Sequence, residues 1–248
     1  MKIVRLLLII CILLTLGTCD LAKNVFNMME EEKLLPTKME TQAKQLFYPV
    51  ELIDGHDIIL SSYRDPALQH DVLKFFENIT GSEETSELIL YYASMLNIAP
   101  ALAFALCEEE SGYNPIAMNR NQNGTIDRGL FQLNSATFPN LKTLDFHDPG
   151  LNTWHGLSHL RWCLDNAGTE VSGLAMYNAG VNRVRSAETP KRTLDYVSRI
   201  LKKERKIEEL FIVEYARIIQ AKDEEKMLIA KNAKTPFRFS LLTPLGVR

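Results

Sequence analysis

Cysteine, glycine, proline and long apolar runs are all scarce in this chain of 248 residues, and each shortage excludes a class of protein. Four cysteines are too few for a small domain held together by disulfides. The 12 glycines and 10 prolines exclude a collagen-like or low-complexity chain. A multi-pass membrane protein is excluded too, because a bilayer-spanning helix needs about 20 apolar residues and such runs do not recur.

An excess of positive charge is also missing. The 28 Lys and Arg residues are outnumbered by 31 Asp and Glu residues, which leaves a formal net charge of −3. Without a basic field, nucleic acid is not an expected partner. Hydrophobic residues make up 46% of the chain and charged residues 24%, which is typical of a globular protein and allows one domain with helical extensions.

The N-terminus has the pattern of a secretory signal. Lys2 and Arg5 precede an apolar run of nine residues, Leu6 to Leu14, which is too short to span a bilayer but suits a signal peptide over residues 1–18. The next residues, Leu16-Gly17-Thr18-Cys19, resemble a bacterial lipobox, in which the cysteine is lipidated. The resemblance implies a protein anchored through Cys19 at the periplasmic side of the cell envelope. An ordinary cleaved signal and an uncleaved anchor are the alternatives.

The rest of the chain is predominantly α-helical in pattern. Residues 20–68 are polar and interrupted by prolines, and predict an irregular or partly helical extension. Residues 113–128 are rich in Asn, Gly and Asp without periodicity, which predicts a loop or short hairpin. Apolar periodicity predicts helices over 88–96, 100–111, 151–166, 169–177, 190–203 and 207–233.

One of these helices presents a glutamate to the core. Ala103, Leu106, Cys107 and Glu110 are spaced i, i+3, i+4, i+7 and therefore share a face. A carboxyl on an apolar face loses solvation, so its pKa rises. A carboxyl that stays protonated near neutral pH is suited to act as a general acid. The alternative is a helix-end glutamate that turns out to solvent.

Five short motifs follow one another between residues 110 and 197. They are Glu110-Ser111-Gly112, Gly129-Leu130-Phe131-Gln132, Asp148-Pro149 with Asn152, Tyr177-Asn178-Ala179-Gly180, and Tyr196-Val197. In this order and at these intervals the set resembles the SLT-type lytic transglycosylases, which have a lysozyme-like fold. The resemblance covers roughly residues 82–203. It implies a mainly α, lysozyme-like domain with a small irregular or β insert, preceded by an extension over 19–81 and followed by a helical tail over 204–248.

The resemblance also implies an activity. Enzymes of this family cleave the β-1,4 bond between N-acetylmuramic acid and N-acetylglucosamine in the glycan strands of peptidoglycan, without a cofactor or metal. Glu110 matches their catalytic acid, which acts first as an acid and then as a base to give a 1,6-anhydromuramoyl product. The matches to substrate-binding positions are Ser111, Gln132, Asn134, Tyr177, Asn178 and Tyr196.

Asp127 admits three interpretations. It fits a second catalytic carboxylate, an electrostatic stabiliser of an oxocarbenium-like transition state, or a turn residue bonded to backbone amides or to Arg128. The first would make the protein a hydrolytic muramidase using Glu110 and Asp127. A non-catalytic peptidoglycan-binding protein is a further alternative. We expect Asp127 at the base of the insert turn and not aimed at Glu110.

Two other pairs of residues could form bonds. Cys107 and Cys163 lie on two predicted helices, and either a disulfide or two buried thiols fits their positions. His155 and His159 have the i, i+4 spacing of zinc ligands. No third ligand is evident, which favours two histidines on a helix surface over a metal site.

Overall fold

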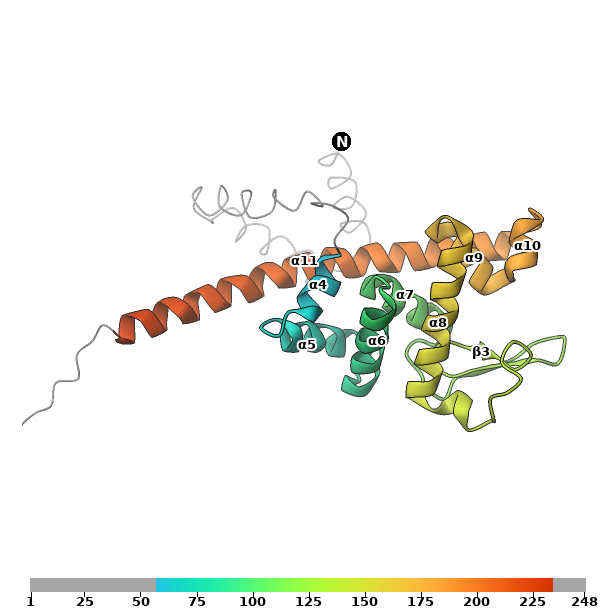
Figure 1. Ribbon diagram of the computed structural model, residues 1–248, viewed down its shortest axis with the longest axis horizontal. Coiled ribbons are helices and arrows are strands. Elements are labelled where there is room, and N and C mark those ends of the chain that lie inside the picture. Colours follow the sequence, from blue (N-terminus) through green and yellow to red (C-terminus); the bar gives the residue numbers. More distant parts are fainter. Residues whose placement is uncertain (1–56, 234–248) are drawn as a thin grey trace, which may run out of the picture. The chain divides into compact units, whose positions relative to one another are not determined.

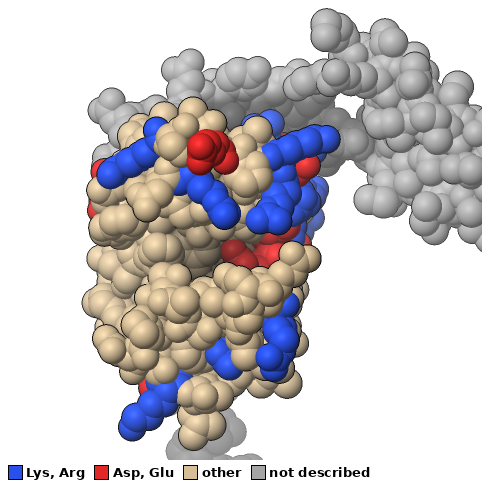
Figure 2. All heavy atoms as spheres, turned by 90° about the vertical axis from the view of Figure 1, so that its right-hand side faces the viewer, with Lys and Arg blue, Asp and Glu red and all other residues tan. Residues whose placement is uncertain are grey.

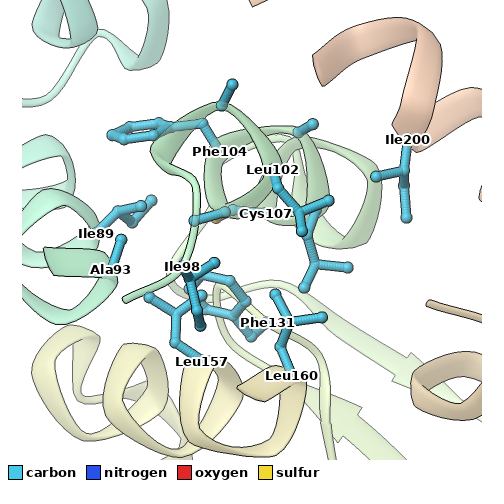
Figure 3. Packing of buried hydrophobic residues seen from close by; sticks show 14 of the residues in the cluster. Ile89, Ala93, Ile98, Leu102, Phe104, Cys107, Phe131, Leu157, Leu160 and Ile200 are labelled. Atoms are coloured by element: carbon cyan, nitrogen blue, oxygen red, sulfur yellow. The ribbon is translucent and has the colours of Figure 1, made fainter. Parts of the chain in front are cut away.

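Helix α7 (Pro100–Ser111) is the central helix of the computed structural model, which describes residues 57–233. Every residue from Pro100 to Cys107 is buried, as expected for a helix that is apolar all round. Figure 3 shows Leu102, Phe104 and Cys107 of this helix among side chains from neighbouring helices. Pro100 occupies the first turn, where its missing N–H costs nothing, and Gly112 ends the helix with a φ of 60°.

Within the described residues, three helices precede α7 and pack with it. They are α4 (Ile58–Arg64), α5 (Gln69–Thr80) and α6 (Glu83–Leu96). Ile59, Val72 and Phe76 belong to the same hydrophobic core as α7. The ring of Phe76 stacks on Phe104, with centroids 3.9 Å apart. Helices α4 and α5 therefore contribute core residues from the stretch expected as an extension, while the division of the chain at residues 81 and 203 stays a prediction.

The insert after α7 is a three-stranded antiparallel sheet, which confirms the expected mainly α fold with a small β insert. Its strands are β1 (Met118–Arg120), β2 (Ile126–Arg128) and β3 (Leu133–Asn134), in that order. Asp127 in the middle strand pairs with Asn119 on one side and Asn134 on the other. Because directly opposed residues share a face, these three side chains lie on the same side of the sheet.

Asn152 of α8 (Pro149–Ala167) joins this helix to the turn between β2 and β3. Its Oδ1 accepts from the Phe131 amide at 2.8 Å, and its Nδ2 donates to the carbonyls of Arg128 and Phe146 at 2.9 and 2.8 Å. Asp148 begins the helix by accepting from the Leu151 amide. The Asp-Pro-x-x-Asn motif is thus explained by a helix cap followed by a buried backbone clamp.

Three helices complete the described chain. They are α9 (Glu170–Ala179), α10 (Val181–Arg185) and α11 (Lys191–Ala233), with a short 3₁₀ turn, η2 (Asp145–His147), before α8. Figure 1 shows α11 passing α9, α7 and α5 as one helix. A break between residues 203 and 207 was expected, but 191–233 contains neither glycine nor proline to cause one.

The packing of α11 is only partly as the periodicity predicts. The apolar residues of 207–233 predict a helix that packs on the domain through Ile207, Leu210, Phe211 and Ile218. Ile207 and Phe211 are buried in the core, as this pattern predicts. Leu210 was expected beside them and is instead 43% exposed. Farther along, Lys222 forms an ion pair of 2.9 Å with Asp71 of α5. No helix within residues 57–233 combines the length and the apolar character needed to cross a bilayer.

Candidate active site

An open groove of about 800 Å³ lies beside the insert sheet and is built from five parts of the fold. The end of α7, the sheet, His159 of α8, the end of α9 with α10, and the start of α11 all line it. Figure 2 shows this face hollowed, with acidic side chains in the hollow and basic side chains above it and below it. The groove brings Asp127 together with six other predicted site residues: Glu110, Gln132, Asn134, Tyr177, Asn178 and Tyr196.

Glu110 lies in the last turn of α7 and contacts α11. Its Oε1 accepts a hydrogen bond from the Tyr196 hydroxyl. The pKa of Glu110 is raised from 4.5 to about 8, mainly by burial, with smaller upward effects from the charges of Asp127 and Glu109 and a lowering effect of the Tyr196 bond. The upward shift expected from the helix periodicity is confirmed. A carboxyl with this pKa is mainly protonated at neutral pH.

The other two glutamates of the Glu-Glu-Glu run fasten α7 to the same helix. Glu109 forms ion pairs with Arg199 at 2.7 Å and with Lys203 at 3.3 Å. Glu108 pairs with Lys203 at 3.1 Å. Three consecutive carboxyls therefore contact α11, and two of the three do so through ion pairs. Glu108 and Glu109 thus contact α11 through charge, whereas Glu110 contacts it through the Tyr196 hydroxyl.

Tyr177 and Asn178 line the groove from the end of α9. The Tyr177 hydroxyl donates to the Phe131 carbonyl at 3.0 Å, and Asn178 Oδ1 accepts from the Thr193 hydroxyl at 2.8 Å. Burial raises the pKa of both Tyr177 and Tyr196 well above 10, so both remain neutral hydrogen-bond donors. The two side chains of the Tyr-Asn pair thus connect the end of α9 to the β2–β3 turn and to α11.

Gln132 occupies a tight turn with a φ of 46°. Its Nε2 donates to the carbonyls of Ala117 and Gly129, at 3.2 and 3.0 Å. Gly129 has a φ of 79°, and a Cβ there would lie 2.2 Å from Asn152 Nδ2. The turn therefore requires glycine, and it directs the Gln132 side chain along the groove wall.

Asp127 lies in the groove, held by two amide side chains. Asn121 Nδ2 donates to its Oδ2 at 2.8 Å, and Asn134 Nδ2 donates to its Oδ1 at 2.7 Å. Both amides also reach the Thr125 hydroxyl. The expected bond to backbone amides or to Arg128 is not what the structure has: the Arg128 guanidinium lies over the Phe146 ring, 5.3 Å from its centroid.

Two predicted residues have local partners instead of free polar groups. The Ser111 hydroxyl donates to the Cys107 carbonyl at 3.2 Å, one turn back in α7, and Ser111 is not among the groove residues. The Asn134 amide nitrogen is engaged with Asp127 and Thr125.

Cys107 and Cys163 are free thiols, both buried. The lipidation position, Cys19, lies outside the described residues.

His159 is a groove residue that the sequence interpretation placed on the helix surface. Its ring lies 5.1 Å from the Tyr177 ring, and burial lowers its pKa, so it is neutral near pH 7. The i, i+4 spacing with His155 reflects a shared contact with the Phe138 ring. Within residues 57–233, no cluster of three His, Cys, Asp or Glu residues could hold a metal.

Comparison with known proteins gives a family match across the groove residues. The family described as transglycosylase SLT domain matches residues 87–198. Invasion protein IagB of Salmonella typhi is 31% identical over 122 residues, which are 47% of this chain and 74% of that protein. IagB of Salmonella typhimurium strain SL1344 is 32% identical over 98 residues, 37% of this chain and 61% of the relative. Protein IpgF of Shigella sonnei is 29% identical over 112 residues, 43% of this chain and 74% of the relative.

Proposed function

The chain belongs to the transglycosylase SLT domain family, and we propose from this premise that it is a peptidoglycan lytic transglycosylase with Glu110 as its catalytic residue. The bond cleaved is the β-1,4 linkage between N-acetylmuramic acid and N-acetylglucosamine. The observation that carries the proposal is a carboxyl with a pKa of about 8, bonded to the Tyr196 hydroxyl in an open groove. Such a carboxyl still has its proton when a substrate binds at neutral pH.

The first step is proton donation. Protonated Glu110 gives its proton to the glycosidic oxygen, the bond from that oxygen to C1 of the muramoyl residue breaks, and positive charge develops at C1. The carboxylate that remains is stabilised by the Tyr196 hydroxyl, which already donates to it. Asp127, whose carboxylate is oriented by Asn121 and Asn134, adds negative charge to the same groove as C1 becomes positive.

The second step returns the proton to Glu110. The Glu110 carboxylate takes the proton of the muramoyl 6-hydroxyl while that oxygen bonds to C1, which closes a 1,6-anhydro ring. The carboxyl ends as it began, and water is not consumed. Gln132, Tyr177 and Asn178 supply neutral polar groups along the groove for the hydroxyl and N-acetyl groups of the sugars, as their positions on the groove wall allow.

The test compares two neighbouring glutamates in the full chain. Glu110→Gln keeps the shape and removes the proton donor, so release of soluble fragments from purified peptidoglycan should fall by about 10²–10⁴-fold. Glu108→Gln is the matched control, since Glu108 is paired with Lys203 and does not line the groove. Fragment release that survives in Glu110→Gln would contradict the proposal. No release by the unaltered protein would favour the non-catalytic binding alternative.

Hydrolysis is the second candidate, favoured by the presence of Asp127 in the same groove as Glu110. A retaining hydrolase needs carboxyls about 5–5.5 Å apart, and an inverting one about 6.5–9.5 Å with room for a water molecule. The Asp127→Asn variant separates the two reactions. We expect reduced but measurable cleavage if Asp127 only stabilises charge. Complete loss of cleavage in a folded Asp127→Asn protein, with reducing ends among the products of the unaltered enzyme, would favour the hydrolase.

The proposed place of action is the periplasmic side of the cell envelope, where SLT domain proteins act on peptidoglycan. The sequence around Cys19 adds a lipid anchor to this proposal. Cells that express the full chain should incorporate labelled fatty acid into it, and the label should be lost in Cys19→Ala. A chain that carries no label would favour an ordinary cleaved signal or an uncleaved anchor.

A further inference from the structure

Three arginines line one side of the groove, and none of them takes part in the chemistry proposed above. Arg183 lies in α10, and Arg192 and Arg199 lie in α11. The acidic residues of the groove, Glu109, Glu110 and Asp127, come from α7 and the sheet. The groove therefore has an acidic part and a basic part, in agreement with the charge distribution on the face shown in Figure 2.

Two of these arginines have guanidinium groups without partners. Among the described residues, the side chains of Arg183 and Arg192 form neither a hydrogen bond nor an ion pair. Arg199 uses only Nε to reach Glu109, at 2.7 Å, and its side chain is 54% exposed, so its other N–H groups remain available. The free N–H groups of these guanidinium groups are therefore available to donate to a ligand.

The fold places these arginines close to Glu110. Arg192, Tyr196 and Arg199 are spaced i, i+4, i+7 and therefore share a face of α11, with the Tyr196 hydroxyl on Glu110. Arg192 and Tyr196 are four residues apart, which corresponds to about 6 Å along the helix axis at a rise of about 1.5 Å per residue. The next residue, Thr193, donates to Asn178, and Arg183 follows Asn178 after the turn at Gly180. The basic surface thus adjoins the point of cleavage.

We propose that Arg183 and Arg192, with Arg199 beside them, bind carboxylates of the peptide stem that the muramoyl residue carries. This inference rests on the proposed function, because it takes peptidoglycan as the ligand. A guanidinium group recognises a carboxylate with two parallel hydrogen bonds, and a neutral sugar gives it no such partner. Glycan strands carry their only anions on the muramoyl side, as stem-peptide carboxylates or as the lactyl carboxylate where the peptide has been removed.

The test measures binding, so that it does not depend on cleavage. The full chain with Glu110→Gln is titrated with three soluble glycan strands: peptide-bearing strands, the same strands with carboxyls converted to methylamides, and strands stripped of peptide so that only lactyl carboxylates remain. Peptide-bearing strands should bind about tenfold more tightly than either of the others. Equal affinity for the peptide-bearing and methylamide strands, or equally tight binding of the stripped strands, would overturn the proposal.

Matched double variants assign the effect to these side chains. Arg183→Gln with Arg192→Gln, added to the Glu110→Gln chain, should remove the preference for peptide-bearing strands. Lys191→Gln with Arg185→Gln removes the same charge from neighbouring exposed positions outside the groove and should keep the preference. Loss of the preference in both double variants would indicate a general charge effect and overturn the proposal. Failure of the proposed function gives a different result, because the unaltered chain would then release no fragments from peptidoglycan.

Discussion

The Tyr196 hydroxyl donates a hydrogen bond to Oε1 of Glu110, joining two residues that are 86 positions apart in the chain. The bond favours the carboxylate form of Glu110, whereas burial favours the protonated form more strongly, and the balance gives a pKa of about 8. Glu110 is thus held as an acid before proton transfer and has a donor ready for its charge afterwards. Both properties are needed if one carboxyl acts twice.

The pH dependence of cleavage should follow from this pKa. Only the protonated form of Glu110 can donate in the first step, and its fraction decreases as pH rises through about 8. We expect kcat/KM to fall about tenfold per pH unit above that point. Initial rates on soluble glycan strands between pH 4 and 10 measure it. A fall that begins near pH 4.5, where an ordinary glutamate titrates, would contradict the account.

Tyr196→Phe should alter both the rate and the pH profile. Removal of the hydroxyl takes away the bond that lowers the pKa of Glu110, so the alkaline limb of kcat/KM should move to higher pH. The rate at neutral pH should fall about 10–100-fold, because the carboxylate formed in the first step loses its donor. A purely structural role would lower the rate and leave the limb in place. Tyr215→Phe, outside the groove, is the control.

The sequence predicts the central helix and the orientation of Glu110 because both depend on local periodicity. It does not predict the partners of Asp127, because Asn121 and Asn134 approach that carboxyl only through the pairing and turns of a sheet too short to show alternation. The groove position of His159 cannot be predicted from one sequence. A histidine pair at helical spacing fits a solvent-exposed helix face as well as it fits a groove. The two predicted ranges, 190–203 and 207–233, are parts of one helix, and the polar stretch around residue 204 continues it without a break.

That stretch contains a buried acid whose charge should destabilise the fold. Glu204 is 9% exposed, and burial together with the charges of Glu170, Glu208 and Asp57 raises its pKa from 4.5 to about 8. Since the folded protein binds the proton more tightly, the free energy of unfolding should decrease as pH rises from about 4.5 to about 8.

Glu204→Gln removes this dependence and should raise the free energy of unfolding at pH 8 by about 1–3 kcal/mol. Glu110 contributes a dependence of the same sign, so the measurement is the difference between variant and unaltered protein in urea unfolding at pH 5 and pH 8. Glu225→Gln, at an exposed position on the same helix, should leave the free energy of unfolding unchanged at both pH 5 and pH 8. A difference that is equal at both pH values would contradict the assignment to Glu204.

Gly156 provides a test of how the core supports the groove. A Cβ at this position would lie 2.4 Å from Cβ of Phe131, whose carbonyl accepts from Tyr177. Gly156→Ala should therefore lower the free energy of unfolding by about 1–3 kcal/mol and reduce cleavage. Gly150→Ala, in the same helix with its nearest neighbour 3.3 Å away, is the control. Equal free energies of unfolding for the two alanine variants would contradict the expected clash between the added Cβ and Phe131.

The central claim is that Glu110 closes an anhydro ring without consuming water. Peptidoglycan digested by the full chain in ¹⁸O-labelled water, and analysed by mass spectrometry, tests this claim most directly. The account predicts muramoyl ends that are one water lighter than reducing ends and contain no ¹⁸O. Reducing ends that carry one ¹⁸O would contradict it and would identify the reaction as hydrolysis.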